Sequence, residues 1–247
     1  DAVRDKETID IELQLKDYET LEKRLERVKK TARTGNKDAQ KELDVLEKVK
    51  KGLEAAISVR AIELSEKERE EYIKPLQFIT DKPVLYVCNV DEKSAVGGNS
   101  YVDAVKEAVK DENAEIIILA VGTEADITEL ESFEERQLFL EDLGLEEPGS
   151  SVLIRAAYKL LNLQTYFTAG VKEVRAWTIH IGDTAPQAAG VIHTDFEKGF
   201  IRAETVKYDD LVKFGGEAGA KENGKVRLEG KEYIVQDGDV MHFRFNV

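Results

Sequence analysis

The residues that could do chemistry follow the apolar run 83–88, at the point where a predicted strand ends; they are Asn89, Val90, Asp91 and Glu92. In the guanine-selective motif Asn-Lys-x-Asp, a short carboxylate accepts hydrogen bonds from two N–H donors on the edge of the base. Here Glu92 stands at the position of that Asp, and Val90 at the position of the Lys. Adenine has no comparable pair of donors, so a site without the short carboxylate no longer has to prefer guanine. Without further support, such residues after a strand more often form only a turn.

The phosphate-binding signature of such sites does not occur in these 247 residues. No stretch reads G-x-x-x-x-G-K-[ST], and Gly97-Gly98 is followed by Asn99-Ser100 with no lysine. A backbone nest for phosphates and a lysine for their charge are therefore both absent from this sequence. Because the chain begins at Asp1 without a Met, we expect it to be part of a longer protein and to be inactive by itself.

The elements that must position the motif form a strand–helix–strand pattern. Short apolar runs at 83–88 and 115–121 are separated by 101–109, which is amphipathic at helical spacing. This order predicts a βαβ unit of a parallel sheet, with the motif at the carboxyl end of a strand, where open α/β sheets bind ligands. Two more helices are predicted at 132–143, with a capping box and Gly144 as its stop, and at 152–161.

The first part of the chain has the pattern of a helical hairpin. Two apolar stripes at three- and four-residue steps are separated by Gly35-Asn36, which predicts an antiparallel hairpin of coiled-coil type. A capping box at Ser65 and Glu68 predicts a third helix. The two stripes consist of Ile9, Leu13, Leu21, Leu25, Val28 and Ala32, and of Ala39, Leu43, Leu46, Val49, Leu53 and Ile57.

The last part of the chain is rich in short strands. They are predicted at 174–179, 200–207, 232–235 and 240–245, and Thr184-x-x-Gln187 caps a helix between the first two. A compact mixed sheet with one crossing helix, an α+β domain, is expected.

Charge is unevenly distributed along the chain. The net charge is -14, but between Lys23 and Arg60 there are 12 Lys and Arg against 6 Asp and Glu, so the remainder carries about −20. This excess predicts contact of the hairpin with nucleic acid, and an ordinary solvated helix face is the alternative. The candidate contact residues are Lys23, Arg24, Arg27, Lys30 and Arg33.

Several classes of function are not indicated. No apolar run approaches the ~20 residues that span a bilayer, so no membrane partner is expected. The single cysteine, Cys88, cannot form an internal disulfide, which favours the cytoplasm, and its strand position predicts a buried apolar role. The three histidines have no metal-ligand spacing, so neither a metal site nor a catalytic residue is predicted.

Longer motifs make the whole chain similar to a known family. They are Tyr166-Phe167-Thr168-Ala169-Gly170, Ala185-Pro186-Gln187-Ala188-Ala189-Gly190, the stretch from Ile192 to Glu204, and Asp237-Gly238-Asp239-Val240-Met241. Together they resemble the YchF family of Obg-like ATPases. The resemblance implies a fragment of an α/β P-loop NTPase with a partial parallel sheet, an inserted coiled-coil hairpin and a C-terminal TGS domain of β-grasp fold. The corresponding domains are 1–74 for the hairpin, 75–161 for the second half of the nucleotide-binding domain, and 162–247 for the TGS domain.

The resemblance also implies a function for the longer protein. It would be a ribosome-associated hydrolase that binds ATP, and also GTP, with magnesium, and acts in translation or stress responses. By position, Asn89 would hold the base-binding loop, Val90 would contact adenine, and Glu92 would replace the guanine-reading carboxylate. The backbone N–H groups of Ala120, Val121 and Gly122 would complete the base pocket.

The residues allow two other functions. The chain could be a non-catalytic module that binds a ribosome or ribosomal RNA through the basic hairpin and the TGS domain. It could also be a structural scaffold, which only the missing P-loop favours. The oligomeric state is not determined by the sequence, and a monomer is the expectation.

Overall fold

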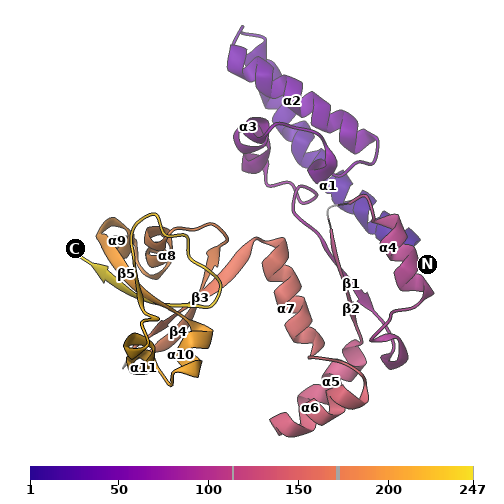
Figure 1. Ribbon diagram of the computed structural model, residues 1–247. Coiled ribbons are helices and arrows are strands. Elements are labelled where there is room, and N and C mark those ends of the chain that lie inside the picture. Colours follow the sequence, from indigo (N-terminus) through magenta and orange to yellow (C-terminus); the bar gives the residue numbers. More distant parts are fainter. Residues whose placement is uncertain (113, 171–172, 247) are drawn as a thin grey trace. The chain divides into compact units, whose positions relative to one another are not determined.

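The computed structural model describes residues 1–112, 114–170 and 173–246, and the chain forms two units, Asp1–Ala156 and Ala157–Val247 (Figure 1). Each unit is described by itself. Among the described residues, no helix combines the length and the apolar character that a membrane crossing requires.

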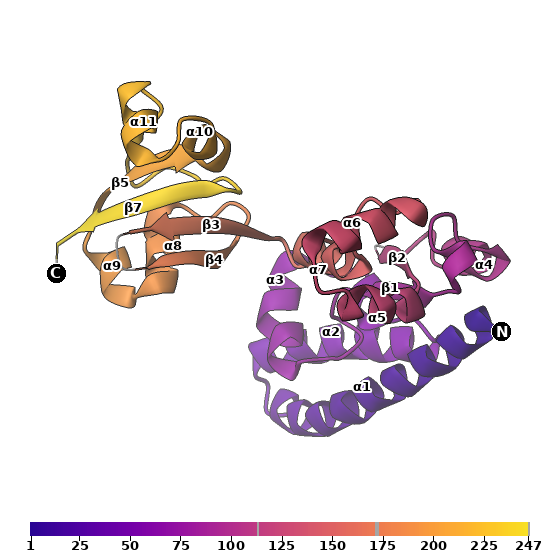
Figure 2. The same ribbon diagram turned by 90° about the horizontal axis from the view of Figure 1, so that it is seen from below.

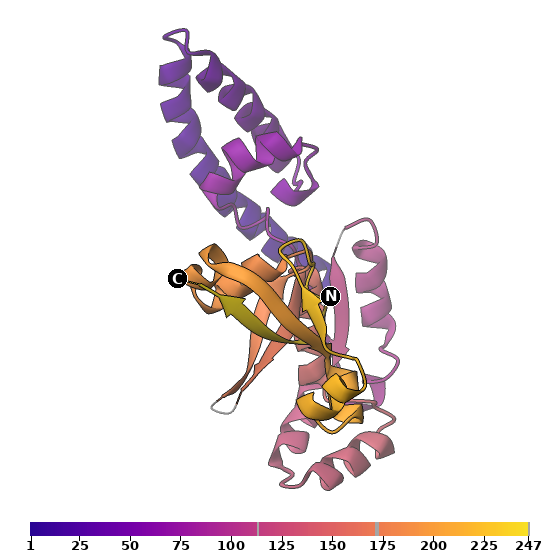
Figure 3. The ribbon, with the colours of Figure 1, turned by 60° about the vertical axis from the view of Figure 1, so that its left-hand side comes forward.

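The first unit begins with a hairpin of two long helices, α1 (Ala2–Ala32) and α2 (Lys37–Glu54), which lie side by side (Figures 2 and 3). Gly35 has φ of 84°, in the left-handed region that favours glycine. Asn36 caps α2, because its side-chain oxygen accepts hydrogen bonds from two backbone N–H groups of the first turn. The predicted break at Gly35-Asn36 is therefore confirmed.

Contacts across the hairpin show that its helices run antiparallel. Tyr18 of α1 donates a hydrogen bond to Glu54 near the end of α2, whereas Arg24 pairs with Glu42 nearer its start. Apolar side chains from both helices, and from the segment that follows them, form one core. Its buried members are Leu21, Leu25, Val28, Ala39, Val45, Leu46, Val49, Leu53, Val59, Ile62, Ile73 and Phe78.

The predicted apolar stripe of α1 is wrong in its first turns. Ile9 and Leu13 are 53% and 36% exposed, because α1 has 31 residues and α2 only 18, so α2 does not reach them. The buried residues at this end of α1 are polar, Gln14 and Asp17. Ile57, predicted on the second stripe, is exposed and lies beyond the end of α2.

The segment after the hairpin consists of short helical turns. The capping box at Ser65 and Glu68 is confirmed, but the α-helical stretch that it starts, α3, covers only Glu66–Glu68. It continues as a π-turn, η2 (Arg69–Ile73), and a 3-10 turn, η3 (Lys74–Leu76). Pro75 lies in η3 and has no N–H, so it cannot donate to the Glu71 carbonyl as an α-helix would require. An earlier 3-10 turn, η1, covers Val59–Ala61.

Two parallel strands carry the predicted motif, with a helix between them as expected. They are β1 (Leu85–Asn89) and β2 (Glu115–Leu119), and the helix is α4 (Ser100–Ala108). A 3-10 turn, η4 (Glu92–Ser94), follows β1. Three helices follow β2, namely α5 (Val121–Glu129), α6 (Phe133–Asp142) and α7 (Gly149–Leu160).

The local signals for α6 are confirmed, since Ser132 and Glu135 form a capping box and Gly144 has φ of 70°. The helix predicted at 152–161 is present as α7. The helix α5 was not predicted, because 115–121 had the appearance of one continuous strand. The prediction that this strand reaches Val121 is therefore wrong.

The second unit is a mixed five-stranded sheet with the strand order β4-β3-β7-β5-β6. Its strands are β3 (Leu163–Ala169), β4 (Val174–His180), β5 (Phe200–Lys207), β6 (Arg227–Glu229) and β7 (Asp239–Phe245). The pair β3–β7 is parallel, and the other pairs are antiparallel. Its helices are α8 (Ala185–Ile192), α9 (Thr194–Lys198), α10 (Tyr208–Lys213) and α11 (Glu217–Glu222).

Helices cover both faces of this sheet, α8 and α9 on one side and α10 and α11 on the other (Figure 2). The single crossing helix of the prediction, α8, has the expected capping box of Thr184 and Gln187, but three further helices accompany it. Tyr166 is fully buried under α8 and donates a hydrogen bond to the Ala188 carbonyl at 2.8 Å. Burial raises the pKa of this phenol.

The strand predicted at 232–235 is wrong. Only Ile234 makes an isolated bridge, to Thr184, and the backbone of this segment bonds to the start of α8 instead of to a strand. The Tyr233 carbonyl accepts from the Ala185 N–H at 2.8 Å, and the Val235 N–H donates to the Asp183 carbonyl at 3.0 Å. These bonds use the backbone groups that a sheet partner would need.

Candidate functional site

The ends of β1 and β2 form the candidate site. Because the strands are parallel with Asn89 opposite Leu119, the loops that follow them leave the same edge of the sheet. The Val90 N–H donates to the Leu119 carbonyl at 2.8 Å, and the Val121 N–H donates to the Asn89 side-chain oxygen at 3.2 Å. Asn89, Val90 and Val121, predicted as one site, are therefore adjacent in space.

The position of 120–122 differs from the prediction. These residues do not end a strand: Ala120 is the N-cap of α5, and Val121 and Gly122 form its first turn. The first N–H groups of a helix have no partner within the helix, and the Ala120 side chain cannot cap them. Asn89 supplies the missing oxygen from the other strand. Asn89 thus holds the second loop in place.

The two carboxylates after β1 have different surroundings. Asp91 caps η4, and its side chain accepts a hydrogen bond from the Ser94 N–H at 3.0 Å. Hydrogen bonding from Ser94, through its side chain first and its backbone N–H second, lowers the pKa of Asp91. Glu92, the first residue of η4, is exposed, and over the described part of the chain it makes no side-chain hydrogen bond or ion pair. The Glu92 carboxylate is thus available to a ligand, whereas that of Asp91 is already bonded.

A cavity of about 390 Å³ lies beside this edge of the sheet. Asn89 and Val90 line it, but Glu92 and the start of α5 do not. Other lining residues are Lys6, Tyr86, Cys88, Asn99 and Tyr101. The concave surface therefore begins at the motif and extends between the start of α1 and α4, rather than enclosing all the predicted residues.

Cys88 is half-buried in β1, not fully buried as predicted. Desolvation by burial raises the pKa of its thiol. The thiolate is therefore disfavoured at neutral pH, which agrees with the prediction of an unreactive residue.

The basic residues predicted on the hairpin are all exposed, four of them on α1 and Arg33 directly after it, but they are not equivalent. Arg24 pairs with Glu42 at 2.6 Å, and this pair links the two helices. The other four form no ion pair with any residue that the structure describes; they are Lys23, Arg27, Lys30 and Arg33. Positions three and four residues apart share one face of a helix, so Lys23, Arg27 and Lys30 form a row of cations without ion pairs among the described residues.

Metal and histidine chemistry has no structural support in the described ranges. Among residues 1–112, 114–170 and 173–246, no group of three His, Cys, Asp or Glu is placed to hold a metal ion. The magnesium that the family resemblance implies is held mainly by nucleotide phosphates and P-loop residues in such proteins, and this sequence has no P-loop motif. His193 caps α9, since its Nδ1 accepts from the Asp195 N–H at 3.2 Å, which is a structural role.

Two residues near the site were missed by the sequence analysis. Glu124 of α5 accepts hydrogen bonds from the backbone N–H groups of Gly149 and Ser150, at 2.6 and 3.2 Å, and so caps α7. Gly149 is buried against this contact, and a Cβ there would lie 2.5 Å from a Leu119 methyl. No local pattern announces a carboxylate that caps a helix 25 residues later, so sequence spacing could not find it.

Comparisons with known proteins show what the chain is similar to. The YchF-GTPase_C family, described as a protein of unknown function (DUF933), matches residues 163–246. A protein of Haemophilus ducreyi named "Ribosome-binding ATPase YchF" is 56% identical over 247 residues, covering 100% of this chain and 67% of the relative. A protein of the same name from Bacillus subtilis is 54% identical, covering 100% of this chain and 68% of the relative. The chain thus spans about two thirds of the length of these relatives.

Solved structures show the same fold. The Schizosaccharomyces pombe YchF GTPase matches with a TM-score of 0.84 and 36% identity, over 99% of this chain and 66% of that chain. A GTP binding protein from Pyrococcus horikoshii matches with a TM-score of 0.58 and 16% identity, which shows the fold alone. The first unit is therefore an α/β structure of the kind found in these GTP-binding proteins. With more than half of its residues identical to those of two family members over its whole length, the chain belongs to the YchF family.

Proposed function

We propose that the natural protein binds and hydrolyses ATP, and also GTP, in association with the ribosome, and that this chain supplies its base-recognition and partner-binding parts. The observation that carries the proposal is the hydrogen bond between the Asn89 side chain and the Val121 backbone. It joins two sheet-end loops at the edge where parallel sheets bind ligands. The names of the relatives, which include both an ATPase and a GTPase, support the same conclusion.

The proposed base site has three parts. Val90 and the backbone of Ala120, Val121 and Gly122 contact the ring, and Glu92 faces its polar edge. Glu92 is one methylene longer than the Asp of the guanine-selective motif, so the pair of hydrogen bonds that selects guanine is weakened. Its exposed, unpaired carboxylate supports this role.

The phosphates and magnesium are proposed to be held by parts of the protein outside this chain. The sequence has no P-loop motif, and the described residues have no metal-ligand cluster. No step of phosphoryl transfer is therefore assigned to any residue here, and its phosphate and water-positioning roles belong to other residues.

Partner binding is assigned to the hairpin and the second unit. The proposed domains are 1–74, a coiled-coil insertion; 75–161, the second half of the nucleotide-binding domain; and 162–247, a TGS domain of β-grasp fold. The mixed sheet crossed by α8 supports the last assignment. The protein would act on ribosomes in the cytoplasm, in translation or in stress responses.

Base recognition is tested by shortening one side chain. Glu92→Asp restores the short carboxylate, and we expect the ratio of GTP to ATP affinity to rise at least about 5-fold, since a hydrogen bond to a charged group contributes about 1.5–3 kcal/mol. Isothermal titration of the complete protein with both nucleotides measures this ratio. Glu129→Asp, an exposed carboxylate at the end of α5, is the matched control. An unchanged ratio in Glu92→Asp, or binding of GTP alone by the wild type, would contradict the proposal.

A second candidate is a non-catalytic module that binds the ribosome or ribosomal RNA through the hairpin. The row of unpaired cations on α1 favours it. Reversal of Lys23, Arg27 and Lys30 to Glu should weaken co-sedimentation with ribosomes and reduce the slope of log affinity against log salt by about 2 to 3. The control reverses three exposed lysines outside the hairpin, which are Lys82, Lys93 and Lys106. Equal effects in both variants would show that only net charge matters.

A further inference from the structure

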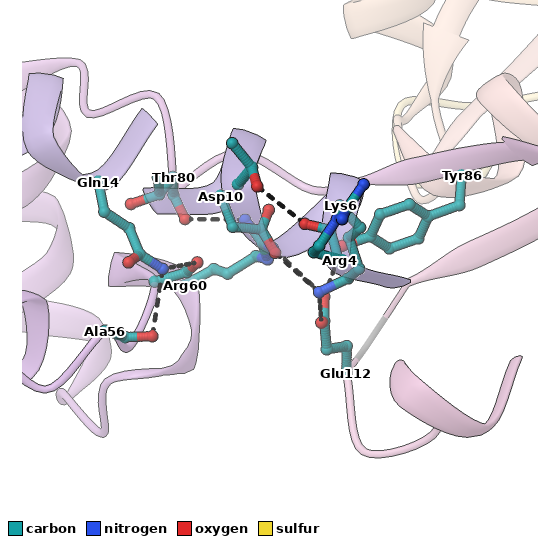
Figure 4. A network of polar contacts seen from close by, with 11 residues as sticks. Arg4, Lys6, Asp10, Gln14, Ala56, Arg60, Thr80, Tyr86 and Glu112 are labelled. Atoms are coloured by element: carbon teal, nitrogen blue, oxygen red, sulfur yellow. Dashed lines mark hydrogen bonds and ion pairs between the residues drawn. The ribbon is translucent and has the colours of Figure 1, made fainter. Parts of the chain in front are cut away.

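The carboxylate of Glu112, in the loop between α4 and β2, joins the first turns of α1 to β1 (Figure 4). One Glu112 oxygen lies 2.8 Å from Lys6 Nζ of α1. The other accepts from the Tyr86 hydroxyl of β1 at 3.0 Å and from Arg60 Nη2 of η1 at 3.3 Å. Three elements far apart in sequence thus share one acceptor group, which we call the Glu112 clasp: Lys6, Arg60, Tyr86 and Glu112.

The clasp is partly shielded from water. The side chains of Lys6, Arg60 and Glu112 are 14%, 19% and 27% exposed. Lys6 also pairs with Asp10 at 2.7 Å and lies 5.5 Å from the centre of the Tyr86 ring. Partly buried pairs are screened by salt much less than exposed ones, so this group depends less on ionic strength than the surface ion pairs elsewhere on α1.

The ionisation of the clasp agrees with its geometry. Desolvation by burial acts to raise the pKa of Glu112, but the hydrogen bonds from Lys6 and Tyr86 outweigh it and hold the pKa below its usual value. Burial, together with the hydrogen bond to Glu112, raises the pKa of Tyr86. At neutral pH, Glu112 is therefore a carboxylate and Tyr86 a hydroxyl donor.

The clasp is continuous with the candidate base site. Tyr86 precedes Asn89 by three positions on β1, about 10 Å along the strand. Lys6 and Tyr86 also line the cavity that Asn89 and Val90 line. On the other side, Arg60 lies in η1, directly after α2, and Lys6 lies in α1 itself. A displacement of the end of β1 therefore acts on α1, and on the segment that follows α2, through one group.

Other contacts fix the hairpin to the segment before β1. Asp17 accepts hydrogen bonds from the Ile79 and Thr80 backbone, and Arg69 pairs with Asp81. These contacts hold α1, through Asp17, and η2, through Arg69, against residues 79–81 and do not include the strand. The Glu112 clasp is different because one of its members, Tyr86, belongs to the strand that ends in the motif.

We propose that the Glu112 clasp couples nucleotide binding at the end of β1 to partner binding on the hairpin, by setting the angle at which the hairpin leaves the sheet. The identity of the two ligands rests on the proposed function. The mechanical part of the proposal, that the clasp sets the angle of the hairpin, does not depend on it. Allosteric coupling of this kind changes affinity by about 5- to 150-fold and is reciprocal.

The mechanical part is tested without nucleotide. Spin labels at Thr34→Cys, beside the hairpin turn, and Asp126→Cys, on α5, in a Cys88→Ser background of the complete protein report the distance between the hairpin and the sheet. Glu112→Gln keeps the side-chain size but cannot accept from Lys6 and Arg60 in the same way. We expect it to broaden or shift the distance distribution, whereas Asp111→Asn, its exposed neighbour, leaves it unchanged. A distribution in Glu112→Gln equal to that of the wild type overturns the proposal.

The coupling is measured by the dissociation constant of a non-hydrolysable ATP analogue with and without purified ribosomes. We expect a ratio of at least about 5 in the wild type and in Asp111→Asn, and below about 2 in Glu112→Gln, with similar affinities in the absence of ribosomes. A ratio near 1 in the wild type, or the wild-type ratio in Glu112→Gln, overturns the proposal. Loss of nucleotide binding in the wild type would instead overturn the proposed function, and the distance measurement would still decide whether the clasp orients the hairpin.

Discussion

The buried carboxylate of Asp17 offers a sharp test of how the hairpin is held. Its side chain is 2% exposed and accepts three hydrogen bonds of 2.7 Å, from the Ile79 N–H, the Thr80 N–H and the Thr80 hydroxyl. The Thr80 hydroxyl in turn accepts from the Val59 N–H at 3.1 Å. Asp17 therefore connects α1 to two segments that follow the hairpin.

Removal of this carboxylate should be costly. Asp17→Ala leaves two backbone N–H groups at a buried site without acceptors, each costing about 1–3 kcal/mol. The Thr80 hydroxyl can rotate towards another acceptor, so its loss adds little to the free-energy cost. The expected loss is about 2–6 kcal/mol, a large share of the 5–15 kcal/mol that stabilises a typical domain.

The measurement uses two signals in one urea titration. Far-UV circular dichroism is dominated by long helices such as α1 and α2, whereas the single tryptophan, Trp177, lies in the second unit. Asp17→Ala should lower the dichroism midpoint by about 1 M or more, with urea m-values of about 1–3 kcal/mol/M, and leave the Trp177 transition in place. Glu12→Ala removes an exposed carboxylate from the same helix and is the control. If both variants shift the midpoint equally, the hydrogen bonds of Asp17 do not hold the hairpin.

Three further predictions concern the first unit. The folded pKa of Glu112 lies below its usual value of 4.5, so its contribution to stability is present above that pH and is lost as pH falls through the folded pKa. Glu112→Gln should therefore flatten the acid limb of a stability–pH curve, and an unchanged limb would contradict this. Gly149→Ala places a Cβ 2.5 Å from a Leu119 methyl and should destabilise by about 1–3 kcal/mol in thermal unfolding, whereas Gly97→Ala, with open space around it, should not. Because burial raises the pKa of Cys88, its alkylation by iodoacetamide at neutral pH should be slow in the folded protein and fast in urea; equal rates would show that the thiol is accessible.

Much of the fold could be predicted because its signals are local. The capping boxes at Ser65, Ser132 and Thr184 each start a helix where expected, and Asn36 caps α2 after the left-handed Gly35. Such signals involve residues within a few positions of one another, so they can be recognised without knowledge of the rest of the chain. The parallel pairing of β1 and β2 was also predicted, since only a crossover joins two such strands.

The errors arise where distant residues decide a boundary. The run 115–121 has the composition of a strand, but β2 stops at Leu119 because Asn89, on another strand, caps the helix that starts at Val121. Residues 232–235 alternate like a strand, but their backbone groups bond to the start of α8. In both cases a hydrogen bond between remote segments prevails over local propensity.

By itself, the sequence determined the family, most of the element types and the motif at the end of β1, because these depend on residue identity and on spacing along the chain. Only the tertiary structure decided which side chains act together. Asp17 is buried and Ile9 exposed because α2 is shorter than α1, and Glu112 meets Lys6, Arg60 and Tyr86 because three separate elements converge there. Burial and shared hydrogen bonds depend on distances in space, and spacing along a chain does not specify those distances.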